Sequence, residues 1–250
     1  IVQGDTDQVK GLGSFGSRSL FVGGSALLGG AREFLEKGKE LAAEELEAAV
    51  EDMSYQNGRF EVVGTSIGLG LFELAARQAE QSFSTETEKS LEERSWPNGC
   101  HIAEVEIDPE TGSVRLIRHG TVDDTGNPIN PMIVEGQLHG GIAQGAGQVL
   151  LEQAVYDSEG QILTGSFMDY AMPRADDLPF FESSTYTDAP CLTNPLGAKG
   201  VGEIGVVGSI PAIANAILDA LWERGVRTFD MPAYPQKIWK LLQKQSRKTI

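Results

Sequence analysis

The chain has 250 residues, of which 40% are hydrophobic, and it carries a formal net charge of -16 at pH 7. This length and apolar content predict a folded chain with a substantial core, and the excess of acidic side chains disfavours nucleic acid and anionic lipid surfaces as partners. The two cysteines, Cys100 and Cys191, cannot supply the thiolates of an iron–sulfur cluster or the ligands of a structural zinc site.

The sequence also bears on the membrane and the cellular compartment. No run approaches the roughly 20 apolar residues of a membrane helix, so we expect no membrane span. Few cysteines and no signal-type apolar segment favour the cytoplasm. The first residue is Ile1 rather than Met, so we expect either one chain of a split protein or a fragment of a longer one.

The first part of the chain is predicted to contain a helix, a hairpin and a second helix. Apolar residues recur at helical spacing over residues 25–50, which predicts one long helix or two short ones broken near Gly38. Two alternating runs flank Asn57 and Gly58, and this pair predicts a tight hairpin turn because both residues accept positive φ. Residues 69–83 again have helical spacing.

A polar, charged stretch at residues 82–99 is predicted to be a linker between lobes of residues 1–97 and 98–250. After it, two alternating runs within residues 100–124 predict antiparallel strands. The remaining predicted elements are a glycine-rich helix over 135–153, a hairpin over 154–166, a loop over 169–181 and helices over 209–225 and 234–248. Because the recognisable strand pairs are hairpins, the sequence favours an α+β fold over a doubly wound sheet.

A glycine-rich loop near the start of the chain has two interpretations. Its glycines, at positions 11, 13 and 16, match a dinucleotide fingerprint, but residues 1–10 are polar and acidic where that fingerprint requires an apolar strand. Ser17, Arg18 and Ser19, followed by Gly24 before a predicted helix, could hold an anion through side-chain and backbone donors. The alternative is a flexible turn with a capping serine.

Residues 121–148 combine oxygen-bearing side chains with an unusual number of glycines. Asp123 and Asp124, with two asparagines after them, have no calcium-loop spacing and predict turns closed by side-chain to backbone bonds. The helix that follows has glycines that could approach a flat ligand beside Gln137 and Gln144, or a neighbouring helix, and the sequence does not decide between them. His139 is predicted to be a core histidine.

The stretch Asn194–Ser209 places Lys199 and Glu203 among glycines and small apolar residues. The lysine precedes the glycines and no Gly-Lys-Ser/Thr follows, which excludes a Walker-type phosphate loop. Glu203 is predicted to be either a desolvated general base or a surface glutamate on an exposed turn.

Four stretches occur in an order that resembles a known family. They are residues 3–26, 120–152, 165–179 and 194–221, the last of which contains Gly-Val-Gly-Glu. In series they resemble the C-terminal half of the molybdopterin-binding large subunit of molybdenum hydroxylases, the xanthine dehydrogenase and aldehyde oxidase family. The residues of these stretches most resemble those of its carbon monoxide dehydrogenase-type members.

This resemblance implies a molybdenum ion bound as molybdopterin cytosine dinucleotide, with the metal held through the pterin dithiolene and by no side chain of the chain. Glu203 would be the general base that takes a proton from the molybdenum-bound hydroxyl. The residues that match cofactor-contacting positions are Ser17, Arg18, Ser19, Gly24, Gln137, Gln144, Lys199, Gly200 and Gly202.

The resemblance also implies partners. The N-terminal half of the large subunit would supply the other wall of the site, and iron–sulfur clusters and FAD would reside on partner chains in a hetero-oligomer. A small aldehyde or N-heterocycle is the expected substrate, since Leu20 stands where close relatives have threonine and carbon monoxide chemistry is thereby disfavoured. The alternatives are a non-catalytic scaffold that keeps the fold without metal, and a nicotinamide-binding protein built on the glycine loop.

Overall fold

The computed structural model describes residues 4–5, 7–8, 11, 13–90 and 93–245. The chain forms two compact units, one made of Ile1–Ser19 with Glu93–Ile250 and the other of Leu20–Glu92. Each unit has its own three-stranded sheet and its own buried apolar cluster. Helices and a sheet occur in both units, and the sheet of the larger unit is mixed, so the predicted α+β class is confirmed.

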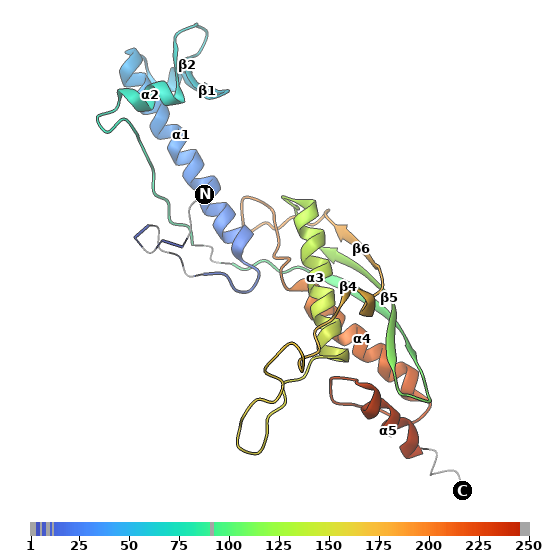
Figure 1. The fold of residues 1–250 in the computed structure, drawn as a ribbon. Helices are drawn as coiled ribbons and strands as arrows, with labels where there is room; N and C mark the ends of the chain where they lie inside the picture. The colour runs from blue at the N-terminus through green and yellow to red at the C-terminus, as the bar shows by residue number, and fades with distance from the viewer. Residues whose placement is uncertain (1–3, 6, 9–10, 12, 91–92, 246–250) are drawn as a thin grey trace. The chain divides into compact units, whose positions relative to one another are not determined.

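The Leu20–Glu92 unit is built on one long helix and a small antiparallel sheet (Figure 1). Asn57 and Gly58 both have positive φ, 49° and 80°, which is the backbone of the predicted tight turn. The elements in chain order are η1 (Ser19–Gly24), which begins one residue before the unit, α1 (Ser25–Leu46), η2 (Val50–Asp52), β1 (Met53–Gln56), β2 (Arg59–Val62), β3 (Gly68–Gly70) and α2 (Leu71–Arg77).

Helix α1 runs without a break through Gly38, so the one-helix alternative is correct. A Cβ at Gly38 would lie 2.3 Å from Cζ of Phe60, a fully buried ring on β2. The glycine therefore lets the helix approach the sheet closely, which accounts for its cost in helix propensity.

The start of the polar stretch predicted as a linker packs back along α1 (Figure 1). The rings of Phe83 and Phe34 stack with their centroids 4.6 Å apart. Lys37 Nζ donates to the carbonyl of Ser84 at 2.9 Å. At least residues 83–84 therefore belong to the packed unit and not to a free linker.

The sheet of the other unit has the order β4–β5–β6, and Figure 1 shows its strands side by side. β4 (Gly99–Ile107) and β5 (Val114–Asp124) are antiparallel, as predicted. The sequence did not predict β6 (Phe181–Tyr186), which pairs with β5 in parallel. Its segment FESSTY is mostly exposed and mostly polar, so it lacks the alternation by which a strand is recognised.

Two helices are layered on this sheet. α4 (Ile204–Trp222) packs against β4, and α3 (Pro131–Leu150) packs against α4. A short turn η3 (Ala175–Asp177) and the helix α5 (Pro235–Gln245) complete the unit. The buried cluster joins Val149 of α3, Ile213 and Ile217 of α4 and Ile238 of α5.

Three further segments differ from the sequence predictions. The helix predicted over residues 69–83 spans only Leu71–Arg77. The hairpin predicted over residues 154–166 is reduced to one bridge between Tyr156 and Ile162. Within the described ranges, α4 is the one helix whose length and apolar composition would match a membrane span. Its face of Ile213, Ile217 and Leu221 is buried in the cluster described above.

Candidate active site

Glu203 occupies the N-cap position of α4, immediately before Ile204. Its backbone carbonyl accepts from Val207 N–H at 3.0 Å, which fixes the main chain at the helix start. Its side chain is exposed, as the surface alternative predicted, and the predicted desolvation is not found. Glu203 Oε2 accepts a hydrogen bond from Ser17 Oγ, 2.8 Å away. The carboxylate thus lies at the positive end of the helix dipole, which favours negative charge.

Hydrogen bonds to its backbone carbonyl groups hold the loop before Glu203. The carbonyl of Gly197 accepts from the N–H groups of Asn127 at 2.8 Å and Cys191 at 2.9 Å. Asn194, which is buried, donates from Nδ2 to the carbonyl of Ala198 at 2.9 Å. These bonds give the glycine-rich segment a defined conformation, so Glu203 is presented by a rigid loop.

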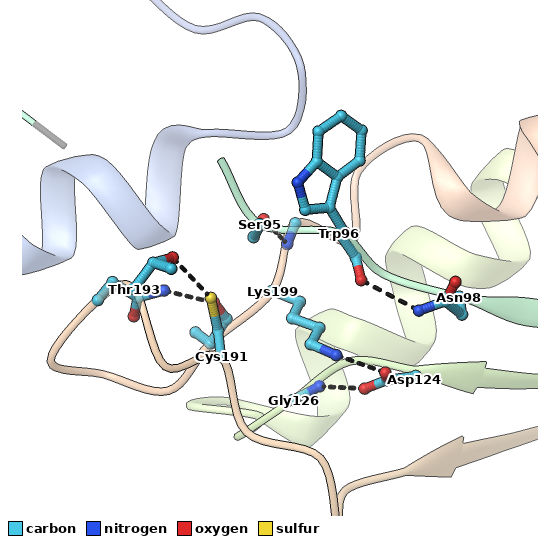
Figure 2. A network of polar contacts seen from close by, with 11 residues as sticks. Ser95, Trp96, Asn98, Asp124, Gly126, Cys191, Thr193 and Lys199 are labelled. Carbon is cyan, nitrogen blue, oxygen red and sulfur yellow. Dashed lines mark hydrogen bonds and ion pairs between the residues drawn. The ribbon is translucent and has the colours of Figure 1, made fainter. Parts of the chain in front are cut away.

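Lys199 anchors this loop to the end of β5 (Figure 2). Its ammonium pairs with Asp124 Oδ2, and the two side chains are 11% and 12% exposed. Its backbone N–H donates to the carbonyl of Thr125 at 3.1 Å, and the N–H of Gly200 donates to Ser95 Oγ at 3.1 Å. The ion pair with Asp124 therefore helps to hold the loop that carries Lys199 in place.

Ser17 and the 197–203 loop lie against each other although they are far apart in sequence. A Cβ at Gly200 would lie 2.8 Å from Cβ of Ser17. A Cβ at Gly202 would lie 3.4 Å from both Ser17 Oγ and Gln137 Oε1. The structure thus brings together five of the predicted site residues, Ser17, Gln137, Gly200, Gly202 and Glu203.

Arg18 and Ser19 lie in the same glycine-rich loop but make local contacts. Arg18 donates from Nε and Nη2 to the carbonyl of Gly13, at 3.1 and 2.9 Å, and its guanidinium lies 4.1 Å from the centroid of the Phe15 ring. The hydroxyls of Ser19 and Ser14 are hydrogen bonded. Since a guanidinium has more N–H donors than these two, Arg18 keeps the chemistry of an anion ligand.

Gly24 lies in the Leu20–Glu92 unit, where it is the N-cap of α1 without a side-chain hydrogen bond. Among the residues that the structure describes, the first strand is β1, beginning at Met53. The glycine-rich loop is therefore not preceded by a strand in the described part of the chain, and most of residues 1–10, where a nicotinamide fingerprint requires that strand, lie outside it.

Some glycines of α3 serve contact with α4. A Cβ at Gly141 would lie 2.8 Å from the backbone nitrogen of Val206 and 2.9 Å from Cα of Gly205. A Cβ at Gly145 would collide with Ser209 Oγ. For these two positions the neighbouring-helix alternative is correct.

Other glycines of α3 have a different environment. A Cβ at Gly136 or Gly140 would meet no atom within 4 Å. Gln137 and Gln144 are exposed on the same helix. Because residues three, four and seven apart share a helix face, Gly136, Gly140 and the two glutamines form a side-chain-poor, amide-bearing stripe that begins beside Gly202.

The predicted turns at the end of β5 are confirmed at Asp124 and Asn130. Asp124 Oδ1 accepts from Gly126 N–H at 3.0 Å, and Asn130 Oδ1 accepts from Ile133 N–H at 3.2 Å, which caps α3. Within the described ranges, no group of three or more His, Cys, Asp or Glu side chains could hold a metal ion. The prediction was wrong for Asp123, whose side chain bonds to other side chains and closes no turn.

A row of buried, hydrogen-bonded polar side chains on β4 and β5 was not predicted. His101 Nε2 lies 3.2 Å from Asp123 Oδ1, and His101 Nδ1 lies 3.1 Å from His119 Nε2. Thr121 donates to the same aspartate. Burial, and next the neighbouring His101, lower the pKa of His119 to about 4, although Asp123 acts in the opposite direction.

The alternation of residues along β5 could have indicated this row of buried polar side chains. Residues 119, 121 and 123 alternate along β5, and antiparallel pairing places His101 opposite Thr121. The third histidine, His139, is partly buried, and its Nε2 lies 3.0 Å from Ser183 Oγ. It is a hydrogen-bonded structural histidine, as predicted.

Comparison with known proteins supplies the family. A model described as a molybdopterin cofactor-binding domain matches residues 1–179. The chain is 36% identical over 253 residues to the 6-hydroxypseudooxynicotine dehydrogenase complex subunit gamma of Paenarthrobacter nicotinovorans, covering 97% of this chain and 32% of that protein. It is 35% identical over 255 residues to the carbon monoxide dehydrogenase large chain of Hydrogenophaga pseudoflava, covering 98% and 32%.

Solved structures support the same family. The Cu,Mo-CO dehydrogenase in its carbon monoxide reduced state matches with a TM-score of 0.80 at 32% identity, covering 98% of this chain and 32% of that one. Quinoline 2-oxidoreductase from Pseudomonas putida 86 matches with a TM-score of 0.78 at 34% identity, covering 96% and 32%. The chain thus spans about a third of the length of these relatives. The predicted resemblance is confirmed: the chain belongs to the molybdopterin cofactor-binding domain family of the molybdenum hydroxylases.

Proposed function

We propose that this chain is the part of a molybdenum hydroxylase large subunit that binds molybdopterin cytosine dinucleotide and supplies Glu203 as the general base. The observation that carries the proposal is the position of Glu203. It is an exposed carboxylate at the start of α4, presented by a rigid glycine-rich loop and bonded to Ser17. A general base must reach a substrate-side proton from a fixed position, and this arrangement meets that requirement.

The surroundings of Glu203 fit a large planar cofactor. The stripe of α3 leaves backbone open at Gly136 and Gly140, so a flat group could lie against it, and Gln137 and Gln144 would offer amide donors and acceptors to it. Arg18 would bind phosphate oxygens, with Ser19 beside it. We also assign the backbone of Lys199, Gly200 and Gly202 to the cofactor site.

The chemistry divides between cofactor and protein. When bound, the cofactor supplies a molybdenum centre that accepts two electrons from the substrate. Glu203 would accept the proton of the water-derived hydroxyl that becomes the oxygen of the product, and it would hold that proton at a carboxylate oxygen. No other side chain is assigned a proton-transfer role.

The substrate is proposed to be a small aldehyde or N-heterocycle. Quinoline 2-oxidoreductase and the nicotine 6-hydroxylase large subunit of Paenarthrobacter nicotinovorans, 34% identical to this chain, are named for heterocyclic substrates. Carbon monoxide dehydrogenase large chains are equally similar to this chain, so likeness alone does not separate the two substrate classes. The choice of the N-heterocycle or aldehyde over carbon monoxide rests on Leu20, which stands in place of the threonine that the family resemblance implies.

The chain would work only within a larger assembly in the cytoplasm. It spans about a third of its relatives' length, so we propose that the N-terminal half of the large subunit completes the pocket. Iron–sulfur and FAD subunits would carry electrons away, because the two cysteines of this chain are too few for a cluster.

The test is Glu203→Gln in the assembled enzyme. The change removes the base and keeps its shape, so we expect unchanged molybdenum content and turnover lower by several orders of magnitude. Glu223→Gln, an exposed glutamate at the other end of α4, is the matched control and should retain full turnover. Near-normal turnover of Glu203→Gln would refute the assigned role, and an assembly that contains neither molybdenum nor cytidine nucleotide would favour the scaffold alternative.

A further inference from the structure

The hydroxyl of Ser17 makes a contact whose direction is fixed by chemistry. A carboxylate only accepts hydrogen bonds, so Ser17 Oγ must donate to Glu203 Oε2 across 2.8 Å. The two residues are 186 positions apart, and both belong to the same unit. The contact therefore joins two separate loops and is not a local turn bond.

The backbone of Ser17 is unusual. Its φ is 55°, in the left-handed region that glycine adopts without cost, and the preceding Gly16 has φ 59°. A non-glycine residue in this region costs on the order of 1 kcal/mol. A glycine would satisfy the loop conformation better, so the serine side chain must be useful for its contact.

The opposite loop is shaped to receive this side chain. A Cβ at Gly200 would lie 2.8 Å from Cβ of Ser17 and 3.0 Å from its carbonyl oxygen. The first distance is shorter than real Cβ contacts, and the second, to backbone, is tighter than most of them. Only a glycine at position 200 lets the loop that carries Glu203 approach Ser17 closely enough for the hydrogen bond.

A hydroxyl suits a partner that gains and loses a proton. It donates to the carboxylate, and after a rotation about the C–O bond it can accept from the carboxylic acid. An ammonium or guanidinium could only donate. The contact between Ser17 and Glu203 can therefore persist in both protonation states and keep an exposed, flexible side chain in one orientation.

We propose that Ser17 is a positioning residue that orients the carboxylate of Glu203, and that holding the cofactor is not the role of its hydroxyl. The inference rests on the proposed function of Glu203 as base. A misplaced base slows proton transfer without weakening substrate binding, because orientation contributes to the rate and not to the ground-state complex.

The test compares Ser17→Ala and Ser17→Gly in the assembled enzyme. Ser17→Ala removes only the hydroxyl, and Ser17→Gly also relieves the left-handed backbone, so a folding defect in the first should not recur in the second. For both we expect kcat to fall about 10- to 100-fold, with KM and molybdenum content within twofold of wild type. A crystal structure of either variant should show Glu203 disordered or in a different rotamer.

Thr87→Val is the matched control, because it removes a hydroxyl that donates to Glu33 Oε2 at 2.6 Å and should leave kcat unchanged. The double variant Ser17→Ala with Glu203→Gln should be no slower than Glu203→Gln alone, since the two residues act as a unit.

Two results would overturn the inference. One is wild-type kcat with Glu203 in its original orientation. The other is a loss of molybdenum in proportion to the loss of kcat, which would make Ser17 a cofactor ligand. If Glu203→Gln alone keeps its turnover, the proposed function fails instead, and the two failures are thereby distinguished.

Discussion

The ion pair of Lys199 and Asp124 leads to a prediction at the scale of residues. Both side chains are nearly buried, 11% and 12% exposed, so removal of one partner leaves a charge without compensation. We expect Lys199→Met to destabilise its unit by about 3–5 kcal/mol, measured as a lower midpoint of denaturant unfolding. Lys199→Met combined with Asp124→Leu should recover most of that loss, because no charge then remains buried.

An exposed ion pair of the same unit serves as the control. Arg118 Nη2 lies 2.9 Å from Glu182 Oε1, and both side chains are 64% exposed. Exposed pairs contribute little to stability, so Arg118→Met should leave the midpoint almost unchanged. Equal effects of Lys199→Met and Arg118→Met would show that the pair with Asp124 is no anchor of the loop.

The residue scale also marks the limit of the sequence as a guide. Glu203 and the glycines around it could be singled out because their order resembles a known family. The partner of the carboxylate, Ser17, lies 186 residues away, and no local pattern encodes a contact at that separation. The same holds for Lys199, whose partner Asp124 is 75 residues away.

At the scale of elements, alanine substitution of two neighbouring glycines of α3 is expected to change stability in opposite directions. A Cβ at Gly141 would lie 2.8 Å and 2.9 Å from backbone atoms of α4, which cannot yield without separating the helices. We expect Gly141→Ala to destabilise the protein by roughly 1–3 kcal/mol. A Cβ at Gly140 would meet open space, so Gly140→Ala should raise stability by up to ~1 kcal/mol through helix propensity alone.

Thermal unfolding of the two variants, compared with wild type, is the measurement. Each variant is the control for the other, since the chemical change and the helix are the same. A decrease for both would mean that the open face of α3 is covered, and an increase for both would mean that α3 and α4 are less tightly packed than the structure indicates.

Elements were predictable where their signals were local. The Asn57–Gly58 pair predicted the hairpin, helical spacing predicted α1 and α5, and α3 was recognised by its length. The helix predicted over 209–225 is α4, which begins earlier, at Ile204. β6 was missed because its polar residues carry no alternation and its pairing with β5 is long-range. The segment over 154–166 alternates but has one bridge, since two short runs alone bury too little apolar surface to form a stable ladder.

At the scale of the whole molecule, His119 makes stability depend on pH. Burial holds the pKa of the folded-state imidazole at about 4, below its ordinary value of 6.5. Between these values the unfolded chain binds a proton that the folded chain does not, so stability is fully present above pH 6.5 and is lost as pH falls toward 4.

Wild type and His119→Gln, compared between pH 7 and pH 5, isolate this effect while most carboxylates remain ionised. The net charge of -16 affects both proteins alike. We expect the melting temperature of wild type to fall more steeply than that of the variant over this range. Parallel curves would show that His119 titrates normally in the folded state.

The discontinuity of one unit has a consequence for synthesis on the ribosome. Leu20–Glu92 is continuous in the chain, whereas the other unit joins Ile1–Ser19 to Glu93–Ile250. The continuous unit can fold soon after it emerges, but the loop that carries Ser17 must wait for the residues around Glu203. At typical rates of protein synthesis that interval is on the order of ten seconds, during which an unpaired glycine-rich segment would be the natural substrate of a protease or a chaperone.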